Sequence, residues 1–174
     1  MALARIRSGV VRRTVGAVLG RLRSTPSAAP PRRPADDDDK ALPDFAGVPQ
    51  PQYAPQADGQ PDPGEVVWTW VAYDDDPTQG KDRPVLVIGR NGEHLLALML
   101  SSQDHDLDAA DEASWGRHWV DVGTGDWDAE HRPSEARVDR ILQIDPARIR
   151  RIGATLDKAR FDEVAAAVRG HASG

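Results

Sequence analysis

The sequence contains no cysteine, only 5% aromatic residues and no long apolar run. Without a thiol the chain can form neither a disulfide, nor a thiolate metal site, nor a cysteine nucleophile. No stretch approaches the roughly 18 apolar residues of a membrane-spanning helix, so no such helix is expected. The length of 174 residues allows one domain with tails, because a domain takes roughly 100–200 residues.

Acidic residues are absent from positions 1–34, which carry eight arginines. The rest of the chain holds 14 basic and 28 acidic side chains, and the net charge of the whole is -6. A basic arm on an acidic body indicates that the two parts meet different partners. The acidic body does not have the charge expected of a protein that binds duplex DNA.

The basic arm spans residues 1–24. Its apolar residues recur at near-helical spacing between arginines, which predicts either a basic amphipathic helix or a disordered arm. The helical alternative is compatible with binding to an anionic membrane surface.

Proline dominates the next segment, where ten of the 14 prolines fall between Pro26 and Pro63. Proline lacks a backbone N–H, so this stretch cannot keep a regular ladder of hydrogen bonds. The run of four aspartates at 36–39 adds charge repulsion. Residues 25–62 are therefore predicted to be a disordered linker.

From residue 63 onward the pattern is typical of strands. Residues 65–73 are rich in Val and Trp, and 84–90 form a nearly continuous apolar run. Asn91-Gly92 favours a type I′ hairpin turn that leads into a return strand over 94–101. Residues 74–83 are expected to form a polar loop.

The second half predicts shorter elements. A long acidic loop covers 102–117, and strands are expected at 118–122, at 134–144 (one bent or two short) and at 149–156. Asp157 can cap a final helix with an apolar stripe that ends at Gly170. The fold class predicted is mainly β with a C-terminal helix, folded as a small, strongly bent barrel.

Three tryptophans lie close together in this half. Trp119 is expected in the core, because it alternates within a strand. For Trp115 and Trp127 two roles stay open: packing in the core, or stacking on nucleic-acid bases.

Four segments resemble, in order, the MazF/PemK-type toxins of type II toxin–antitoxin systems. These are the Gly64-Glu65 strand opening, Gln79-Gly80 followed by Arg83-Pro84, the strand that ends at Ser101-Ser102, and the late strands that end at Ile144-Asp145. The resemblance assigns residues 63–170 to a MazF/PemK-like domain.

The resemblance implies an SH3-like barrel of the MazF/CcdB type, a homodimer, a cognate antitoxin and a cytoplasmic location. It implies a metal-independent endoribonuclease that cuts single-stranded RNA and leaves a 2′,3′-cyclic phosphate and a 5′-hydroxyl. No metal and no cofactor are expected. Asp104, His105, Asp106 and His118 do not have the spacing of a standard metal site.

The resemblance places catalysis at Arg83 and Ser101. Gln79 and Lys81, from the same loop as Arg83, and Ser102 are expected to contact RNA, although a solvated turn would also account for the loop residues. Arginine suits this chemistry, because its permanently charged planar fork matches phosphate oxygens. Serine can orient a hydroxyl or a phosphate oxygen, but its low acidity makes it a poor general base. Ser102 is the substitute if the register is off by one residue.

A second hypothesis treats the same domain as a non-catalytic interaction module tethered by the basic arm. The acidic loop over 102–117 favours it, because carboxylates near the site would repel phosphates.

Overall fold

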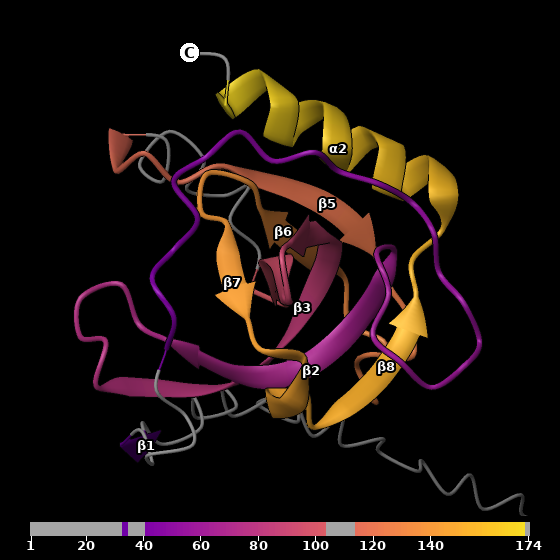
Figure 1. Ribbon diagram of the computed structural model, residues 1–174. Helices are drawn as coiled ribbons and strands as arrows, with labels where there is room; N and C mark the ends of the chain where they lie inside the picture. The colour runs from indigo at the N-terminus through magenta and orange to yellow at the C-terminus, as the bar shows by residue number, and fades with distance from the viewer. Residues whose placement is uncertain (1–32, 35–40, 104–113, 173–174) are drawn as a thin grey trace, which may run out of the picture.

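The computed structural model describes residues 33–34, 41–103 and 114–172. It consists of a curved antiparallel sheet with one helix lying across it (Figure 1). The strands are β1 (Arg33–Pro34), β2 (Glu65–Ala72), β3 (Gln79–Asn91), β4 (His94–Ser101), β5 (Trp119–Gly123), β6 (Ser134–Arg137), β7 (Leu142–Ile144) and β8 (Arg151–Thr155). A 3-10 turn at Pro146–Arg148 precedes β8, and the helix α2 (Lys158–Ala172) ends the described chain.

The strands pair in the order β5-β6-β4-β3-β2-β8, with β1 added to β3 and β7 added to β4. The mainly-β class with a C-terminal helix is confirmed. Within the described residues no ladder joins β5 to β8, so the sheet is curved without closing into the barrel that the resemblance implies.

Both faces of the sheet are apolar, because β2, β4 and the 85–89 part of β3 carry buried residues at almost every position. One cluster lies between the sheet and α2 and includes Leu86, Leu98 and the helix stripe of Phe161, Val164 and Val168. The other lies on the opposite face and is built around Val67, Val85, Val87, Ala97 and Met99. Burial on both faces explains the continuous apolar runs of the sequence.

The helix begins as predicted. The Asp157 carboxylate accepts hydrogen bonds from the N–H groups of Ala159 and Arg160 at 2.9 and 3.3 Å, which caps the first turn. The helix continues two residues past Gly170, to Ala172.

The β3–β4 turn differs from the predicted one. Asn91 pairs with His94, so the two-residue loop is Gly92-Glu93 rather than Asn91-Gly92. Gly92 has φ +60° and Glu93 is not in the left-handed region. A positive φ at the first loop position alone is the pattern of a type II′ turn, in which glycine is favoured.

The predicted loop at 74–83 is also shorter than expected, because β3 already begins at Gln79. The Tyr73 N–H donates to the Gln79 carbonyl at 2.9 Å and closes the turn. Gly80 follows, with the Trp70 ring packed where a side chain would stand: a Cβ there would meet the ring at 2.5 Å. The close packing of Gly80 against Trp70 accompanies strand pairing between β2 and β3 inside the predicted loop.

The disordered linker predicted over 25–62 is wrong for residues 41–62, here called the N-terminal strap. The strap wraps along the outside of the sheet toward α2 without regular secondary structure (Figure 1). The Phe45 N–H donates to the Ile141 carbonyl at 2.8 Å, and the Tyr53 hydroxyl donates to the Leu156 carbonyl at 2.9 Å. Prolines suit such an extended segment, because a proline has no backbone N–H and the strap forms no regular ladder that would require one at every position.

The predicted arm over 1–24 lies outside the described residues, as does the linker before the strap except for the β1 pair, Arg33–Pro34. In the described part of the chain no helix has the length and apolarity to cross a membrane. The arm's proposed contact with a membrane surface therefore stays a prediction.

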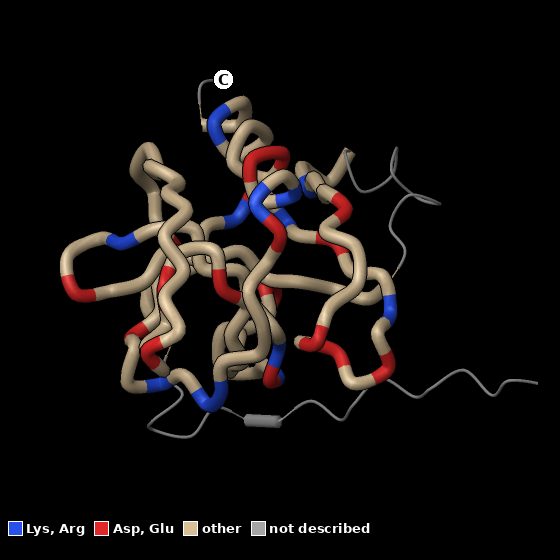
Figure 2. Tube along the Cα trace, turned by 90° about the vertical axis from the view of Figure 1, so that its right-hand side faces the viewer, with Lys and Arg blue, Asp and Glu red and all other residues tan. Residues whose placement is uncertain are grey.

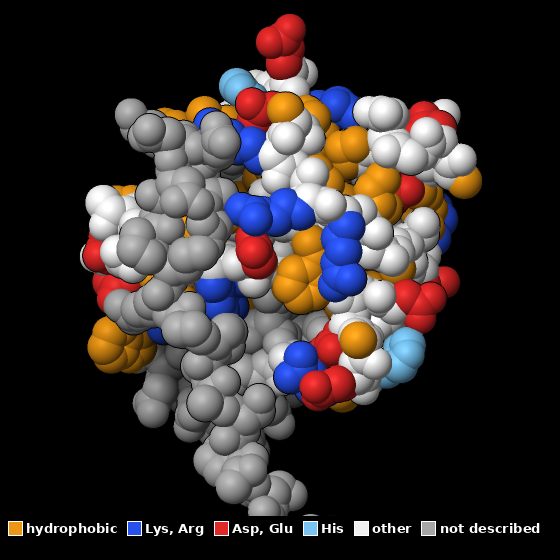
Figure 3. All heavy atoms as spheres, turned by 90° about the horizontal axis from the view of Figure 1, so that it is seen from below, with side chains coloured by type: hydrophobic (Ala, Val, Ile, Leu, Met, Phe, Trp, Pro, Cys, Tyr) orange, Lys and Arg blue, Asp and Glu red, His pale blue; other side chains and the backbone are white. Residues whose placement is uncertain are grey.

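Acidic and basic residues are interspersed along the described chain (Figure 2). On the face seen from below, Lys and Arg side chains lie beside apolar ones (Figure 3). One basic–aromatic contact of the molecule joins β8 to β2, where the Arg151 guanidinium lies 4.5 Å from the centre of the Trp68 ring.

The tryptophans divide between core and surface. Trp127 is buried and donates from its ring N–H to the Ser134 hydroxyl at 3.2 Å. Trp119 packs half-buried against the second apolar cluster, which agrees with the core role expected for it. Trp115 is 73% exposed and does not belong to the core.

Candidate active site

A cleft of about 480 Å³ opens where β3 begins and β4 ends. Arg83 and Ser101 both line it. The antiparallel β3–β4 register pairs Val85 with Met99, and continued by two residues it sets Arg83 opposite Ser101. Side chains alternate along a strand, so both point to the same face of the sheet as Val85 and Met99. The sheet thus brings together two residues that are 18 positions apart in the chain.

Arg83 is a half-buried cation at the start of the apolar part of β3. Burial lowers the pKa of its guanidinium; Tyr73 and Asp74 oppose this shift, and the charge of Arg140 adds to it. Among the described residues its guanidinium has neither a hydrogen-bond partner nor an ion pair. A cation in this state can accept an anion without first giving up a carboxylate.

Two other arginines of the cleft are already paired. Arg137 binds Asp74 and Asp139, and its contact with Asp139 is 2.8 Å long. Arg140 binds Asp74 as well, and it reaches the strap through Asp44 at 2.7 Å. These ion pairs hold the wall of the cleft together.

Asp74 is the centre of this wall. Burial raises the pKa of its carboxyl, but the hydrogen bond from Arg137 and the charges of Arg137 and Arg140 outweigh burial and leave the pKa lowered. A carboxylate held this firmly is a poor proton acceptor, so Asp74 acts on the site through the arginines that it orients.

Ser101 ends β4 and is half-buried. Its hydroxyl oxygen accepts a hydrogen bond from the Gln103 N–H at 3.2 Å. This bond fixes the oxygen and leaves the O–H free to donate into the cleft. Ser102 is exposed and does not line the cleft, so the geometry favours Ser101 over its neighbour.

Gln79 and Lys81 share the face of β3 that carries Arg83, because they precede it by four and two residues. Neither lines the cleft. Burial lowers the pKa of Lys81, and the nearby charge of Arg83 lowers it further. Lys81 therefore places a second positive charge outside the cleft, roughly 7 Å from Arg83 along β3.

The sequence leaves the role of Trp115 open and does not assign the other members of the cleft wall to the site. The members of the wall come from the β2–β3 turn, from β6 and the residues after it, and from the segment before β5: Tyr73, Asp74, Trp115, Arg117, Arg137 and Arg140. One signal was available, since Arg137, Asp139 and Arg140 are charged residues in the middle of the segment 134–144, which the sequence predicts to be strand.

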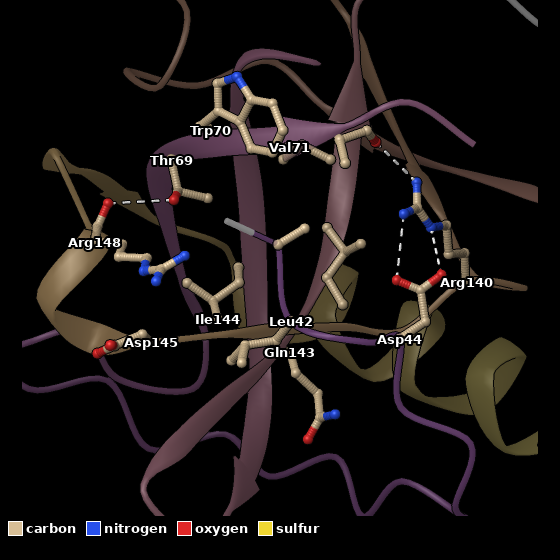
Figure 4. Close-up of a pocket in the computed structure, with 13 residues that line it drawn as sticks. Leu42, Asp44, Thr69, Trp70, Val71, Arg140, Gln143, Ile144, Asp145 and Arg148 are labelled. Atoms are coloured by element: carbon tan, nitrogen blue, oxygen red, sulfur yellow. Dashed lines mark hydrogen bonds and ion pairs between the residues drawn. The ribbon is translucent and has the colours of Figure 1, made fainter. Parts of the chain in front are cut away.

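Two other cavities are less suitable for a polyanion. A pocket of about 50 Å³ lies under the strap, with Leu42 and Ile144 at its centre and Asp44 facing Arg140 (Figure 4). It is far smaller than the roughly 300 Å³ of a small-molecule site. A larger hollow at the start of α2 carries three aspartates and only Arg160 as a cation.

The described residues contain no group of three or more His, Asp or Glu side chains placed to hold a metal ion. Asp104, His105 and Asp106 lie outside the described residues, as does most of the acidic loop. The effect of that loop on the site thus stays a prediction.

Comparison with protein families gives a match over residues 62–171 to the family described as PemK-like, MazF-like toxin of type II toxin–antitoxin system. The match starts within one residue of the resemblance seen in the sequence and includes Arg83, Ser101 and the final helix. Comparison with curated proteins gives no match.

Proposed function

Since the chain belongs to the PemK-like, MazF-like toxins of type II toxin–antitoxin systems, we propose that it is an endoribonuclease that cuts single-stranded RNA without a metal ion. The products are a 2′,3′-cyclic phosphate and a 5′-hydroxyl. The observation that carries the proposal is the unpaired, half-buried Arg83 in one cleft with Ser101.

In the proposed reaction the ribose 2′-oxygen attacks the adjacent phosphorus and the bond to the 5′-oxygen breaks. The 2′-hydroxyl gives its proton to water, the leaving 5′-oxygen gains one, and the group that donates it is reprotonated from water, so no net proton is consumed. Negative charge grows on the phosphoryl oxygens between these events. A preorganised cation at that place lowers the barrier, since it is already oriented and partly shielded from water.

Arg83 is the residue suited to this task. Its fork can bond two phosphoryl oxygens at once, and no described carboxylate forms an ion pair or hydrogen bond with it. Pro84 supports its position, because a residue before proline is held in an extended conformation. We assign charge stabilisation to Arg83, and also proton donation to the leaving oxygen.

Ser101 is assigned to positioning. Its oxygen is fixed by the Gln103 N–H, so the O–H can donate to a phosphoryl oxygen or orient the 2′-hydroxyl. Lys81 and Gln79 lie on the same face of β3 and are proposed to contact the RNA backbone beyond the cleft. Ser102, which is exposed at the end of β4, is proposed as an outer contact.

The family also implies an antitoxin that binds this chain. We propose that the toxin is a homodimer and that its antitoxin covers the Arg83 cleft. The four arginines that line the cleft would suit an acidic segment of such a partner as well as RNA.

The test is cleavage of a mixed-sequence single-stranded RNA by the full chain in EDTA, with analysis of the product ends. We expect cyclic phosphates in the wild type and loss of cleavage in Arg83→Ala. Arg150→Ala is the matched control, because Arg150 is an exposed arginine paired with Asp82 at 3.0 Å and lies outside the cleft. Equal cleavage by wild type and Arg83→Ala would remove Arg83 from the mechanism, and no cleavage by the wild type would favour the interaction module.

A further inference from the structure

Trp115 is the most exposed large apolar side chain of the described residues, at 73%, ahead of Val48 at 64%. Exposed tryptophan is unusual, since burying the ring would be favourable. The Trp115 ring is not part of the core, whereas Trp70 and Trp127 are buried, at 7% and 2% exposed. The exposure of Trp115 leaves its ring face open to a ligand at this place.

The ring lies on the rim of the same cleft that holds Arg83 and Ser101. It is followed by Gly116, whose φ of +73° turns the chain sharply, and then by Arg117. The Arg117 guanidinium lies 5.8 Å from the centre of the Trp115 ring, within cation–π range. Together they form a flat aromatic and cationic wall, here called the Trp115 platform.

The platform is attached to the sheet next to the wall of the cleft. The His118 N–H donates to the Asp139 carboxylate at 2.7 Å, and the Val138 N–H donates to the His118 carbonyl at 2.9 Å. The same Asp139 carboxylate holds Arg137. The chain just after the platform is thus tied to β6 and to the paired arginines.

We infer that the Trp115 platform stacks a base of the bound single strand, next to the nucleotide whose phosphate meets Arg83. This rests on the proposed function and adds to it a base-binding site. A single exposed ring beside a cationic cleft is the arrangement used for single-stranded nucleic acid, in which bases stack on aromatic side chains while cations follow the backbone. Every base has a π face, so the platform strengthens binding with little choice of sequence.

A protein partner would leave a different pattern. Hot spots of protein interfaces are aromatic residues surrounded by further contacts that exclude water. Trp115 instead stands beside a cleft whose lining carries four arginines and two aspartates. Tyr73 and Trp119 also line the cleft, but Trp115 is the exposed ring of the three, and the excess of arginine favours a nucleic-acid base over an antitoxin side chain.

The test measures binding of the full chain to a short single-stranded 2′-O-methyl RNA, which cannot be cut because its 2′-oxygen is blocked. Trp115→Ala is expected to raise Kd roughly fivefold to a hundredfold, the range measured for the loss of one base stack. Trp115→Phe keeps a ring and is expected to restore most of the affinity. Val48→Ala is the matched control, since Val48 is exposed and does not line the cleft.

A second probe is an abasic strand with the same phosphates. Wild type and Trp115→Ala are expected to bind it equally, because it has nothing to stack. If Trp115→Ala binds the base-containing strand as tightly as the wild type does, the inference is overturned. This also holds if the variant loses binding to the antitoxin, because Trp115 would then serve a protein partner. Binding that depends on Trp115 in a chain that cuts no RNA would uphold the platform and refute the nuclease.

Discussion

Arg83 and Ser101 line one cleft from neighbouring strands, each two residues beyond the Val85–Met99 pair, and the guanidinium has no ion-pair partner among the described residues. Arg137, in the same cleft, is bound by two aspartates. Evidence for a role of Arg83 therefore lies in its lack of a partner as much as in its place before Pro84.

The first prediction concerns the shape of the cation. Arg83→Lys keeps a positive charge but loses the planar fork, so we expect kcat to fall and the KM for RNA to change little. Arg83→Ala should cost about 10²–10³ in kcat, as does loss of one donor to a transition-state anion. Single-turnover cleavage measures both. Full activity in the lysine variant would show that charge without bidentate geometry is sufficient.

The second prediction separates two neighbouring serines. Ser101→Ala removes a donor to a charged group and should lower cleavage about tenfold to a hundredfold. Ser101→Thr, which keeps a hydroxyl, should recover most of it. Ser102→Ala should have a smaller effect, because Ser102 is exposed and lies outside the cleft lining. The reverse order of effects would shift the catalytic position to Ser102.

The third prediction concerns acid and the ion pairs of the cleft wall. The pKa of Asp74 is lowered in the folded chain. Its carboxylate therefore adds stability above its unfolded pKa of about 3.9, and this is lost as pH falls through the lower folded value. The difference in unfolding free energy between wild type and Asp74→Asn should be largest near neutral pH and shrink below about pH 4. Urea titrations across this range measure it, and a difference independent of pH would contradict the ion-pair explanation.

The fourth prediction compares two glycines. Gly80→Ala would place a methyl group 2.4 Å from the Val71 carbonyl oxygen and 2.5 Å from the Trp70 ring. We expect a loss of about 1–3 kcal/mol in stability, as for other overpacked sites. Gly170→Ala meets nothing within 4 Å and lies inside α2, so it should gain up to about 1 kcal/mol. Thermal unfolding of both variants gives the comparison, and an unchanged Gly80→Ala variant would show that the Trp70 contact is not tight.

The fifth prediction tests the N-terminal strap. Tyr53→Phe removes the hydrogen bond to the Leu156 carbonyl and should cost about 1 kcal/mol. Tyr53→Ala also removes the ring that lies 5.2 Å from Phe161, and should cost roughly 2–4 kcal/mol. Both are read from urea unfolding of the full chain. If Tyr53→Ala is as stable as the wild type, the strap does not stabilise the domain.

Local patterns predicted the elements well, and long-range contacts account for most of the errors. The β3–β4 hairpin and the α2 stripe follow from the spacing of apolar residues over one segment. The strap was missed because its order depends on contacts such as that of Tyr53 with Leu156, 103 residues apart. A proline-rich segment gives no local sign of such a contact.

In the candidate site, too, local motifs predicted some residues and long-range contacts decided the others. Arg83 and Ser101 could be named from the short motifs that carry the family resemblance. The β3–β4 register that relates them includes a shift between Val87 and Gly89, which the turn alone does not predict. The contacts of Asp74 with Arg137 and Arg140 could not be predicted from such motifs, since they span 63 and 66 residues. Trp115 was noticed, but its spacing did not decide between the core and the rim of a cleft.

The sequence by itself determined which segments form strands and helix, and which family the chain resembles, because periodicity and short motifs are properties of neighbouring residues. Only the tertiary structure decided which arginines are held by carboxylates, which tryptophan stays outside the core and where the strap lies. Ion pairing and burial depend on distances between residues far apart in the chain, and only the folded sheet sets those distances.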